Sequence, residues 1–307
     1  AGAPFKTDAA LRTRTAPGAS YGDLVVTTRG PANLLGTCGI TFMTAESDSV
    51  NLVFGTHAWS FSDDELRRLL SKGLFLDAGA AEIFVERGFG SLIGAIPRRR
   101  LTRDASRYAI EKVVAPATGV RKNFPFSVNL ATSVVELAPG KGTREWTELC
   151  GPSYERIGAG LTVFTNSLEG RVAISACDLD RFLLDSPTPF SPWNMNVPRR
   201  TLIRNLVNAL AARRTPVSVE GDAWLFPVEM RKTGGTAVAV FNLGGDPARD
   251  IRVLLPERKK ILSCTALQPL EKPAKAACAA KPAGRGTSIT VKTTLGRFGL
   301  CVIETAG

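Results

Sequence analysis

The chain has 307 residues, of which 44% are hydrophobic and 22% are charged. These ordinary proportions exclude a fibrous or wholly disordered protein, and the length predicts two domains, each able to bury a core. A net charge of +11 would suit a polyanionic partner, but we expect neither nucleic acid nor a membrane, because the sequence contains no nucleic-acid-binding motif and no apolar run of roughly 20 residues.

The first elements in chain order are a short helix and a strand-helix unit. Residues 30–40 read as the helix, and a strand before it would have to come from residues 24–27. The apolar run at 50–54 predicts a strand buried on both faces of a parallel sheet. Ser62 and Glu65 have the spacing of a capping box, and leucines at helical spacing follow them.

A second strand-helix unit follows directly. Residues 73–77 predict a strand, residues 80–87 predict a helix, and Gly88 stands where a left-handed helix cap is expected. Two such units in succession indicate an α/β fold with a parallel sheet.

The pattern weakens between residues 96 and 128, and residues 126–137 alternate loosely enough for an irregular β excursion. Strands are then predicted at 161–164 and 171–175, joined by the turn sequence NSLEG. A proline-rich loop at 186–200 precedes an amphipathic helix carrying Leu202, Ile203, Leu206, Val207 and Leu210.

From about Thr215 the chain changes to short β-rich runs separated by turn residues, which is typical of an antiparallel sandwich. The low-complexity stretch at 272–286 reads as a mobile loop between strands. We therefore expect one domain over residues 1–214 and a second over residues 215–307.

Cysteines and basic residues offer few candidate sites. The six cysteines have no C-x-x-C spacing and only one histidine accompanies them, so no metal site is expected. Cys177 and Cys301 lie in apolar runs and read as small core residues. Cys264 and Cys278 would form a disulfide only in an exported protein, and this stays open. The basic run at 97–107 reads as a solvated face.

Three stretches carry a family resemblance: KGLFLDAGAAEIFVERGFGSLIG (72–94), LTVFTNSLEGRVAIS (161–175) and AVAVFNLGGDPARDIRVLLPE (237–257). In order and spacing they resemble the amidotransferase-like middle domain, called the trimerisation domain, and the terminal β-sandwich of bacterial family 42 β-galactosidases. The resemblance covers about two-thirds of the chain. It implies a flavodoxin-like open parallel sheet followed by a small antiparallel β-sandwich.

The catalytic chemistry of such enzymes is missing from the sequence. A family 42 glycosidase takes its two carboxylates from a barrel of roughly 250 residues, and no barrel pattern is present. Asp77, Asp178 and Asp180 follow strands, where capping carboxylates are common. An amidotransferase needs a cysteine activated by a histidine, whereas the matching turn begins at Asp77 and the only histidine is His57. We therefore expect no catalytic residue, no metal and no cofactor.

Three residues could contact carbohydrate: His57 and Trp59 follow a strand, and Trp193 lies in the proline-rich loop. Each has a structural alternative, because a lone histidine or tryptophan in a loop is often a packed residue.

The resemblance implies a non-catalytic accessory region of a glycoside hydrolase in carbohydrate metabolism, which supports oligomerisation and the active-site wall. Its expected partners are other copies of itself, with a trimer as one candidate, and a missing N-terminal catalytic barrel. The alternatives are a stand-alone carbohydrate-binding module and a small hydrolase with an unrecognised site. The first 18 residues lack the apolar core of a signal peptide and resemble a cut within a longer soluble protein. A removed leader stays open, so bacterial cytoplasm and export are both compatible.

Overall fold

The computed structural model describes residues 1–2, 29–102, 108–128, 133–179, 196–211 and 214–306. The chain divides into two compact units: Ala1–Leu34 with Met43–Arg213, and Leu35–Phe42 with Arg214–Gly307. Each unit has a buried apolar core of its own. The strand expected at 24–27 lies outside the described residues.

The described helices are few and short. They are α3 (Arg29–Thr37), η1 (Gly55–Ser60), α4 (Asp63–Leu70), α5 (Ala78–Glu86), α6 (Gly90–Ile93), η2 (Pro116–Thr118) and α9 (Val197–Leu210). None of the helices in the described part of the chain is long and apolar enough to cross a lipid bilayer.

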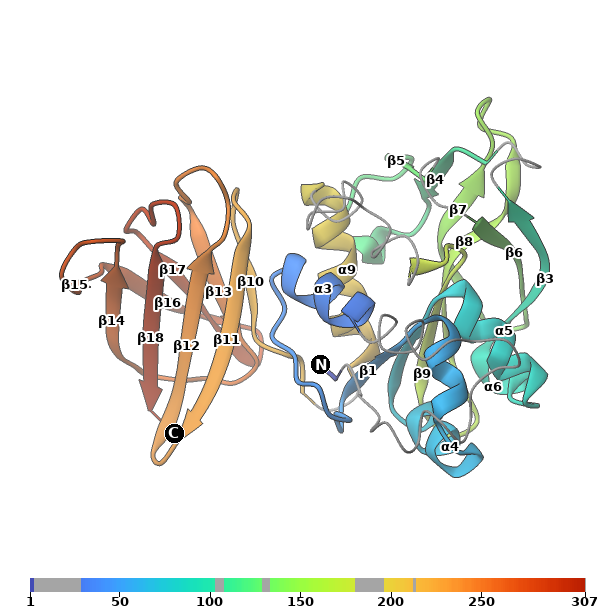
Figure 1. Cartoon of the computed structure of the whole chain (residues 1–307), viewed down its shortest axis with the longest axis horizontal. Helices are drawn as coiled ribbons and strands as arrows, with labels where there is room; N and C mark the ends of the chain where they lie inside the picture. Colours follow the sequence, from blue (N-terminus) through green and yellow to red (C-terminus); the bar gives the residue numbers. More distant parts are fainter. Residues whose placement is uncertain (3–28, 103–107, 129–132, 180–195, 212–213, 307) are drawn as a thin grey trace. The chain divides into compact units, whose positions relative to one another are not determined.

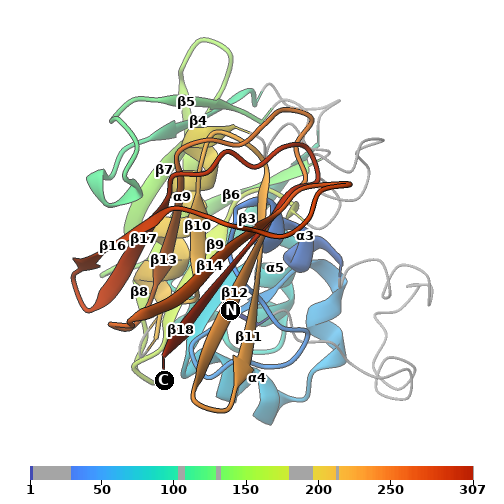
Figure 2. The ribbon, with the colours of Figure 1, turned by 90° about the vertical axis from the view of Figure 1, so that its left-hand side faces the viewer.

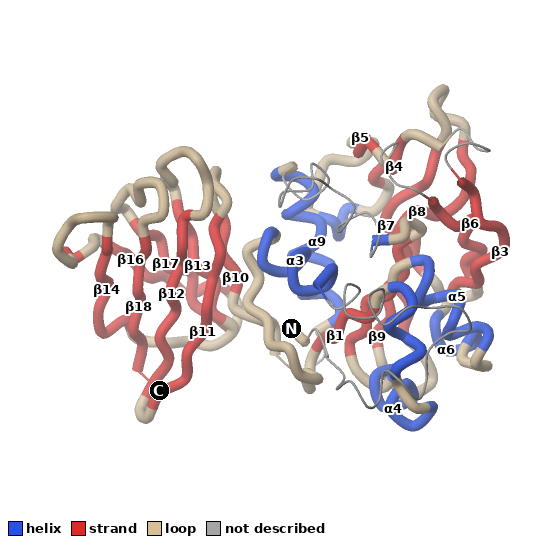
Figure 3. Tube along the Cα trace, viewed as in Figure 1, coloured by secondary structure: helices blue, strands red, loops and turns tan. Residues whose placement is uncertain are grey.

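A mixed sheet forms the first unit (Figures 1 and 3). Its strands are β1 (Val50–Val53), β2 (Gly73–Leu76), β3 (Ala95–Thr102), β4 (Ile110–Val113), β5 (Pro125–Ser127), β6 (Ser133–Pro139), β7 (Arg144–Cys150), β8 (Arg156–Thr165) and β9 (Arg171–Ser175). The strand order is β1-β2-β9-β8-β7-β4-β5. Off this path, β3 pairs with β6, and β6 pairs with β8. Pairing is parallel across β1, β2 and β9 and antiparallel elsewhere.

The parallel part is built as the sequence predicts. Every residue of β1 and β2 is buried. Ser62 Oγ accepts from the backbone N–H of Glu65 at 3.2 Å, and Glu65 Oε2 accepts from that of Ser62 at 2.7 Å, which completes the capping box. Gly88 has a left-handed φ of 83°, so it adopts the helix cap expected of it.

The sheet stops being parallel at the turn between β8 and β9. Asn166 holds this turn: its Oδ1 accepts from the backbone N–H groups of Leu168 and Gly170, both at 3.0 Å. Its Nδ2 donates to the carbonyl of Leu70 at the end of α4, at 2.9 Å. A connection this short can join only antiparallel neighbours, so the predicted turn at NSLEG is confirmed and the antiparallel pairing of β8 with β9 makes the sheet mixed.

The region between residues 95 and 150 holds more regular structure than the sequence predicted. It forms β3 to β7, and the strand expected at 161–164 extends over all of β8. In β3 three consecutive arginines, Arg98 to Arg100, break the apolar alternation that marks a half-buried strand. The amphipathic helix is confirmed as α9, with all five of its predicted apolar residues buried. It begins at Val197, inside the predicted proline-rich loop, whose residues up to 195 lie outside the described ranges.

The second unit contains two antiparallel sheets, drawn in orange to red in Figure 2. Its strands are β10 (Ser218–Glu220), β11 (Leu225–Lys232), β12 (Gly235–Asn242), β13 (Ile251–Leu255), β14 (Ile261–Leu267), β15 (Ala274–Lys275), β16 (Cys278–Ala283), β17 (Gly286–Val291) and β18 (Leu300–Ala306). The four-stranded sheet has the order β10-β13-β17-β16 and the five-stranded sheet β11-β12-β18-β14-β15.

The stretch at 272–286 corrects one expectation, because it forms β15 and β16 and is not a loop. β16 pairs with β17 through a tight connection in which Gly284 has a φ of 59°. β16 is an edge strand, where Pro282 can be accommodated without an N–H group to donate. Most of its side chains are exposed and small, so the sequence shows none of the apolar alternation of a strand.

Candidate functional site

The candidate site is the edge of the sheet where the parallel strands β1, β2 and β9 end, here called the carboxyl edge. Open α/β sheets bind ligands at this edge. His57 follows β1, Asp77 follows β2 and Asp178 follows β9. The backbone also joins these turns, because the N–H group of Ala78 donates to the carbonyl of Cys177 at 3.2 Å.

Asp77 holds two backbone segments together. Its Oδ1 accepts from the N–H group of Gly55 at 2.7 Å and from that of Ala80 at 2.9 Å. The first contact fixes the turn after β1, where Gly55 has a left-handed φ of 54°, and the second caps the N-terminus of α5. The side chain is fully buried. Asp77 therefore occupies the strand-to-helix turn as a capping carboxylate.

Asp178 belongs to a cluster of ion pairs. Its Oδ2 accepts from Arg100 Nη1 and from Ser133 Oγ. Arg100 Nη1 also donates to Ser133 Oγ at 2.8 Å, and its Nη2 pairs with Glu82 Oε2. The cluster joins β3, β6, α5 and the segment after β9.

The electrostatics of Arg100 favour its charged form. Burial lowers the pKa of the guanidinium, but hydrogen bonds to Glu82 and Asp178 and the charges of both carboxylates outweigh it, so the pKa rises. The basic run at 97–107 was expected to form a solvated face. Its described arginines, Arg98 to Arg100, are exposed, while Arg100 also joins the cluster and Arg99 pairs with Glu136 at 3.2 Å.

A buried ion pair lies between Glu111 on β4 and Arg199 on α9. The two side chains are 5% and 2% exposed, and Arg199 Nη1 donates to Glu111 Oε2. Thr147 donates to Glu111 Oε1 at 2.6 Å, and the guanidinium of Arg199 lies 3.9 Å from the ring centroid of Phe126. The carboxylate is thus neutralised and hydrogen-bonded inside the unit.

The sequence interpretation missed both clusters, although a local signal existed for one of them. Glu111 alternates with Val113 on the buried side of β4, and Arg199 stands at helical spacing from Leu202 and Ile203 on the apolar stripe of α9. A charge inside each apolar pattern indicates a buried pair. Arg100 and Asp178 are 78 positions apart, and no local pattern connects them.

Cys177 is confirmed as a small core residue, with a 3% exposed side chain. Burial raises the pKa of its thiol, and the nearby charge of Glu111 raises it further. The thiol is therefore protonated at neutral pH and is a poor nucleophile.

The three residues proposed to contact carbohydrate differ in accessibility. His57 is 1% exposed, packs edge-on against Phe61 with ring centroids 5.1 Å apart, and has Ser60 Oγ 3.3 Å from its Nδ1. A sugar could reach it only if η1 moved. Trp59 is half-buried, and the guanidinium of Arg87 lies 5.9 Å from its ring centroid. Trp193 lies outside the described residues, as does Asp180.

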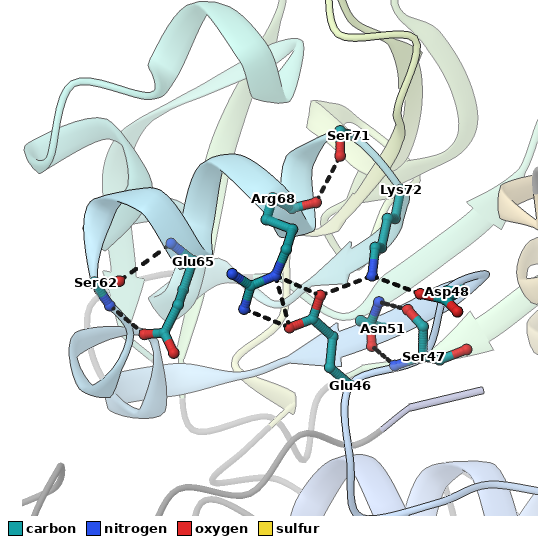
Figure 4. Close-up of polar contacts among 9 residues, drawn as sticks. All are labelled: Glu46, Ser47, Asp48, Asn51, Ser62, Glu65, Arg68, Ser71 and Lys72. Carbon is teal, nitrogen blue, oxygen red and sulfur yellow. Dashed lines mark hydrogen bonds and ion pairs between the residues drawn. The ribbon is translucent and has the colours of Figure 1, made fainter.

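The opposite edge, where β1 and β2 begin, carries a partly exposed ion-pair cluster (Figure 4). Glu46 accepts from Arg68 Nη2 and from Lys72 Nζ, both at 2.8 Å, and Lys72 also pairs with Asp48 at 3.1 Å. The hydrogen bond from Arg68, helped by Lys72 and opposed by burial, lowers the pKa of Glu46 to about 2. These contacts tie the segment before β1 to the end of α4.

The described residues contain no group of three or more His, Cys, Asp or Glu side chains placed to hold a metal ion. A general acid or a nucleophilic carboxylate must reach a reacting atom. Asp77, Asp178 and Glu111 instead accept hydrogen bonds from protein groups and are 0 to 5% exposed. These hydrogen bonds therefore hold the turns of the carboxyl edge in place.

Solved structures with a similar fold include two kinds of glycoside hydrolase. No protein-family profile and no curated protein matches the sequence. Among solved structures, α-L-fucosidase isoenzyme 2 from Paenibacillus thiaminolyticus is similar with a TM-score of 0.61 and 11% identity, over 92% of this chain and 45% of that one.

Two family 42 β-galactosidases are also similar, each at 11% identity and a TM-score of 0.51. Gan42B from G. stearothermophilus matches 92% of this chain and 36% of its own, and the Bacillus circulans sp. alkalophilus enzyme matches 95% and 38%. The chain therefore shares its fold with a partial region of GH42 β-galactosidases and spans less than half the length of each of these three structures.

Proposed function

We propose that this chain is the non-catalytic accessory region of a family 42-like glycoside hydrolase, with a role in assembly and in walling the active site. The observation that carries the proposal is the likeness of nearly the whole chain, across both units, to a minor part of two kinds of glycoside hydrolase. On this proposal the catalytic barrel is the part of those enzymes that this chain does not match.

The first unit is, on this proposal, a flavodoxin-like domain of the class I amidotransferase type that has kept the fold without the chemistry. Support comes from the parallel strands β1, β2 and β9 and from helices α4 and α5 between them. Asp77 supplies the helix cap at the turn where an amidotransferase would carry its cysteine. We also propose that the domains extend over residues 1–214 and 215–307.

The engagement of the carboxylates supports a structural role for the carboxyl edge. Asp178 and Glu111 each accept from an arginine and a hydroxyl, which holds both side chains in a fixed orientation within the unit. A retaining glycosidase instead needs one carboxyl group kept protonated beside a second one about 5 Å away. The proposed partners are therefore other copies of this chain, with a trimer as one candidate, and a catalytic barrel.

Carbohydrate contact is proposed for Trp59 first, because its ring is half-buried whereas His57 is enclosed. An indole ring can pack on the apolar face of a sugar at low entropic cost. Trp193 and His57 remain proposals of lower priority.

Two measurements test the proposed function. Light scattering at tens of micromolar protein should give a mass above the 32.8 kDa of the single chain, since a stable interface buries more than about 1,000 Å². A strictly monomeric mass at every concentration would remove self-association and leave only packing against a barrel. Nitrophenyl glycosides should not be hydrolysed; turnover that survives repurification and disappears in Asp178→Asn, but not in the surface control Glu136→Gln, would overturn the non-catalytic role.

A further inference from the structure

Three cysteines of the second unit gather at its apolar core. Cys264 on β14 and Cys301 on β18 belong to the five-stranded sheet, and their sulfur atoms are 3.5 Å apart. Cys278 is the first residue of β16 in the four-stranded sheet and packs against the same apolar core that contains Cys264. The backbone supports this approach, because Ala276 donates to the carbonyl of Cys264 at 2.8 Å.

The three thiols differ in their access to solvent. Cys301 is fully buried and Cys264 is 5% exposed, whereas Cys278 packs against the core but remains partly exposed. All three are reduced in the structure. A reagent from solvent would therefore meet Cys278 before it could reach Cys264.

We propose that Cys278, Cys264 and Cys301 form a thiol–disulfide exchange site for small disulfides, in which Cys278 attacks the reagent and Cys264 completes a bond between the two sheets. This site lies in the second unit and is independent of the proposed accessory function.

The chemistry balances with one small disulfide as the oxidant. The Cys278 thiol loses its proton to solvent, and its sulfur attacks one sulfur of the reagent, breaking the S–S bond and releasing one thiolate. Cys264 then loses its proton and attacks Cys278 Sγ, releasing the second thiolate. The two released thiolates take up the two protons. The reagent is reduced to two thiols, and the two cysteines are oxidised to one disulfide.

Strand register disfavours Cys301 as the disulfide partner of Cys264. Cys264 lies opposite Ile303, and Ala266 lies opposite Cys301, so Cys264 and Cys301 are diagonal neighbours. Diagonal positions are usually about 7–8 Å apart, beyond the 4.4–6.8 Å between Cα atoms that a disulfide prefers. Cys301 instead stabilises the cluster through its hydrogen bond, which lowers the pKa of its own thiol while burial opposes this.

The reaction should be slow at neutral pH. Burial, followed by the neighbouring Cys264, raises the pKa of the Cys278 thiol to about 11. The thiolate is the attacking species, so the rate should rise about tenfold for each pH unit between pH 7 and 9.

Peptide mapping tests the site on the full chain. The protein is incubated with glutathione disulfide at pH 7, 8 and 9, quenched with acid and N-ethylmaleimide, and cleaved with trypsin, which cuts after Lys275 and so separates Cys264 from Cys278. The expected product is a reducible cross-link between these two peptides, which forms about tenfold faster with each pH unit.

Variants assign the roles of the three cysteines. Cys264→Ser should trap glutathione on Cys278, Cys278→Ser should slow the reaction at least tenfold, and Cys301→Ser should keep the cross-link. Cys150→Ser, in the first unit, is the matched control and should behave as the unchanged chain does. Circular dichroism checks that each variant folds. The peptide map of the unchanged chain tests the cross-link even if a variant does not fold. Cys278 left free or carrying only glutathione in the unchanged chain, or an unaltered rate in Cys278→Ser, would overturn the proposal.

Discussion

Replacing Glu111 with glutamine tests whether the buried pair is part of the structural framework of the first unit. The glutamine side chain would keep an oxygen to accept from Thr147, but the substitution would remove the negative charge next to Arg199, whose side chain is 2% exposed. A guanidinium cannot lose its charge at accessible pH. The substitution therefore removes a buried negative charge that faces this cation.

The expected loss follows from this burial. Breaking a buried ion pair by removing one partner costs about 3–5 kcal/mol, whereas an exposed pair contributes about 0–1 kcal/mol. The matched control is Glu136→Gln, because Glu136 pairs with Arg99 through side chains that are 31% and 69% exposed. We expect a loss of about 3–5 kcal/mol for Glu111→Gln and under about 1 kcal/mol for the control.

Urea unfolding, followed by circular dichroism and by the fluorescence of buried Trp146 on β7, measures both losses. The double variant Glu111→Leu with Arg199→Met should recover most of the stability, because it replaces both charges with apolar groups of similar length. Equal losses for Glu111→Gln and the control, or a double variant no more stable than Glu111→Gln, would refute the reasoning.

Three further predictions concern the same unit. Because the pKa of Glu46 in the folded chain is lowered to about 2, its ion pairs should stabilise the fold by about 1 kcal/mol above pH 4.5, and this contribution should be lost as the pH falls toward 2. The difference in unfolding free energy between the unchanged chain and Glu46→Gln, measured against pH, checks this. A difference that stays constant with pH would contradict it. Asp77→Ala should cost about 2–3 kcal/mol, because two buried N–H groups lose their acceptor, and Asp77→Asn should cost clearly less; equal urea midpoints for the two variants would be the contrary result. Gly94→Ala should lower the midpoint of thermal unfolding, because Gly94 has a left-handed φ of 81° and an added Cβ would collide with Phe164. The control Gly88→Ala has a similar φ but open space around it, so it should lower the midpoint less. A larger decrease for Gly88→Ala would contradict this account.

The parts of the fold that the sequence predicted are those governed by local patterns. The capping box at Ser62 and Glu65, the apolar stripe of α9 and the turn at Asn166 are each set by residues a few positions apart. The mixed character of the sheet was not predicted, because it depends on which strands pair. The edge strand β16 was missed because its exposed face carries small and charged residues without alternation.

The candidate site shows the same division. Asp77 was predicted as a capping carboxylate from its place between a strand and a helix, and the structure gives it that contact. The partners of Asp178 were not predictable, because Arg100, Ser133 and Glu82 come from three separate elements that only the tertiary fold brings together. Likewise, Cys264 and Cys278 were a candidate pair from sequence, but the contact with Cys301 depends on the pairing of β14 with β18.

The most direct test of the central claim, that this chain is the accessory region of a larger glycoside hydrolase, is the coding sequence immediately upstream of Ala1. The account predicts an uninterrupted reading frame that encodes repeated strand-helix units of a barrel, with two carboxylates at the carboxyl ends of its strands. A stop codon in frame just upstream, or a frame that encodes an unrelated domain, would contradict it.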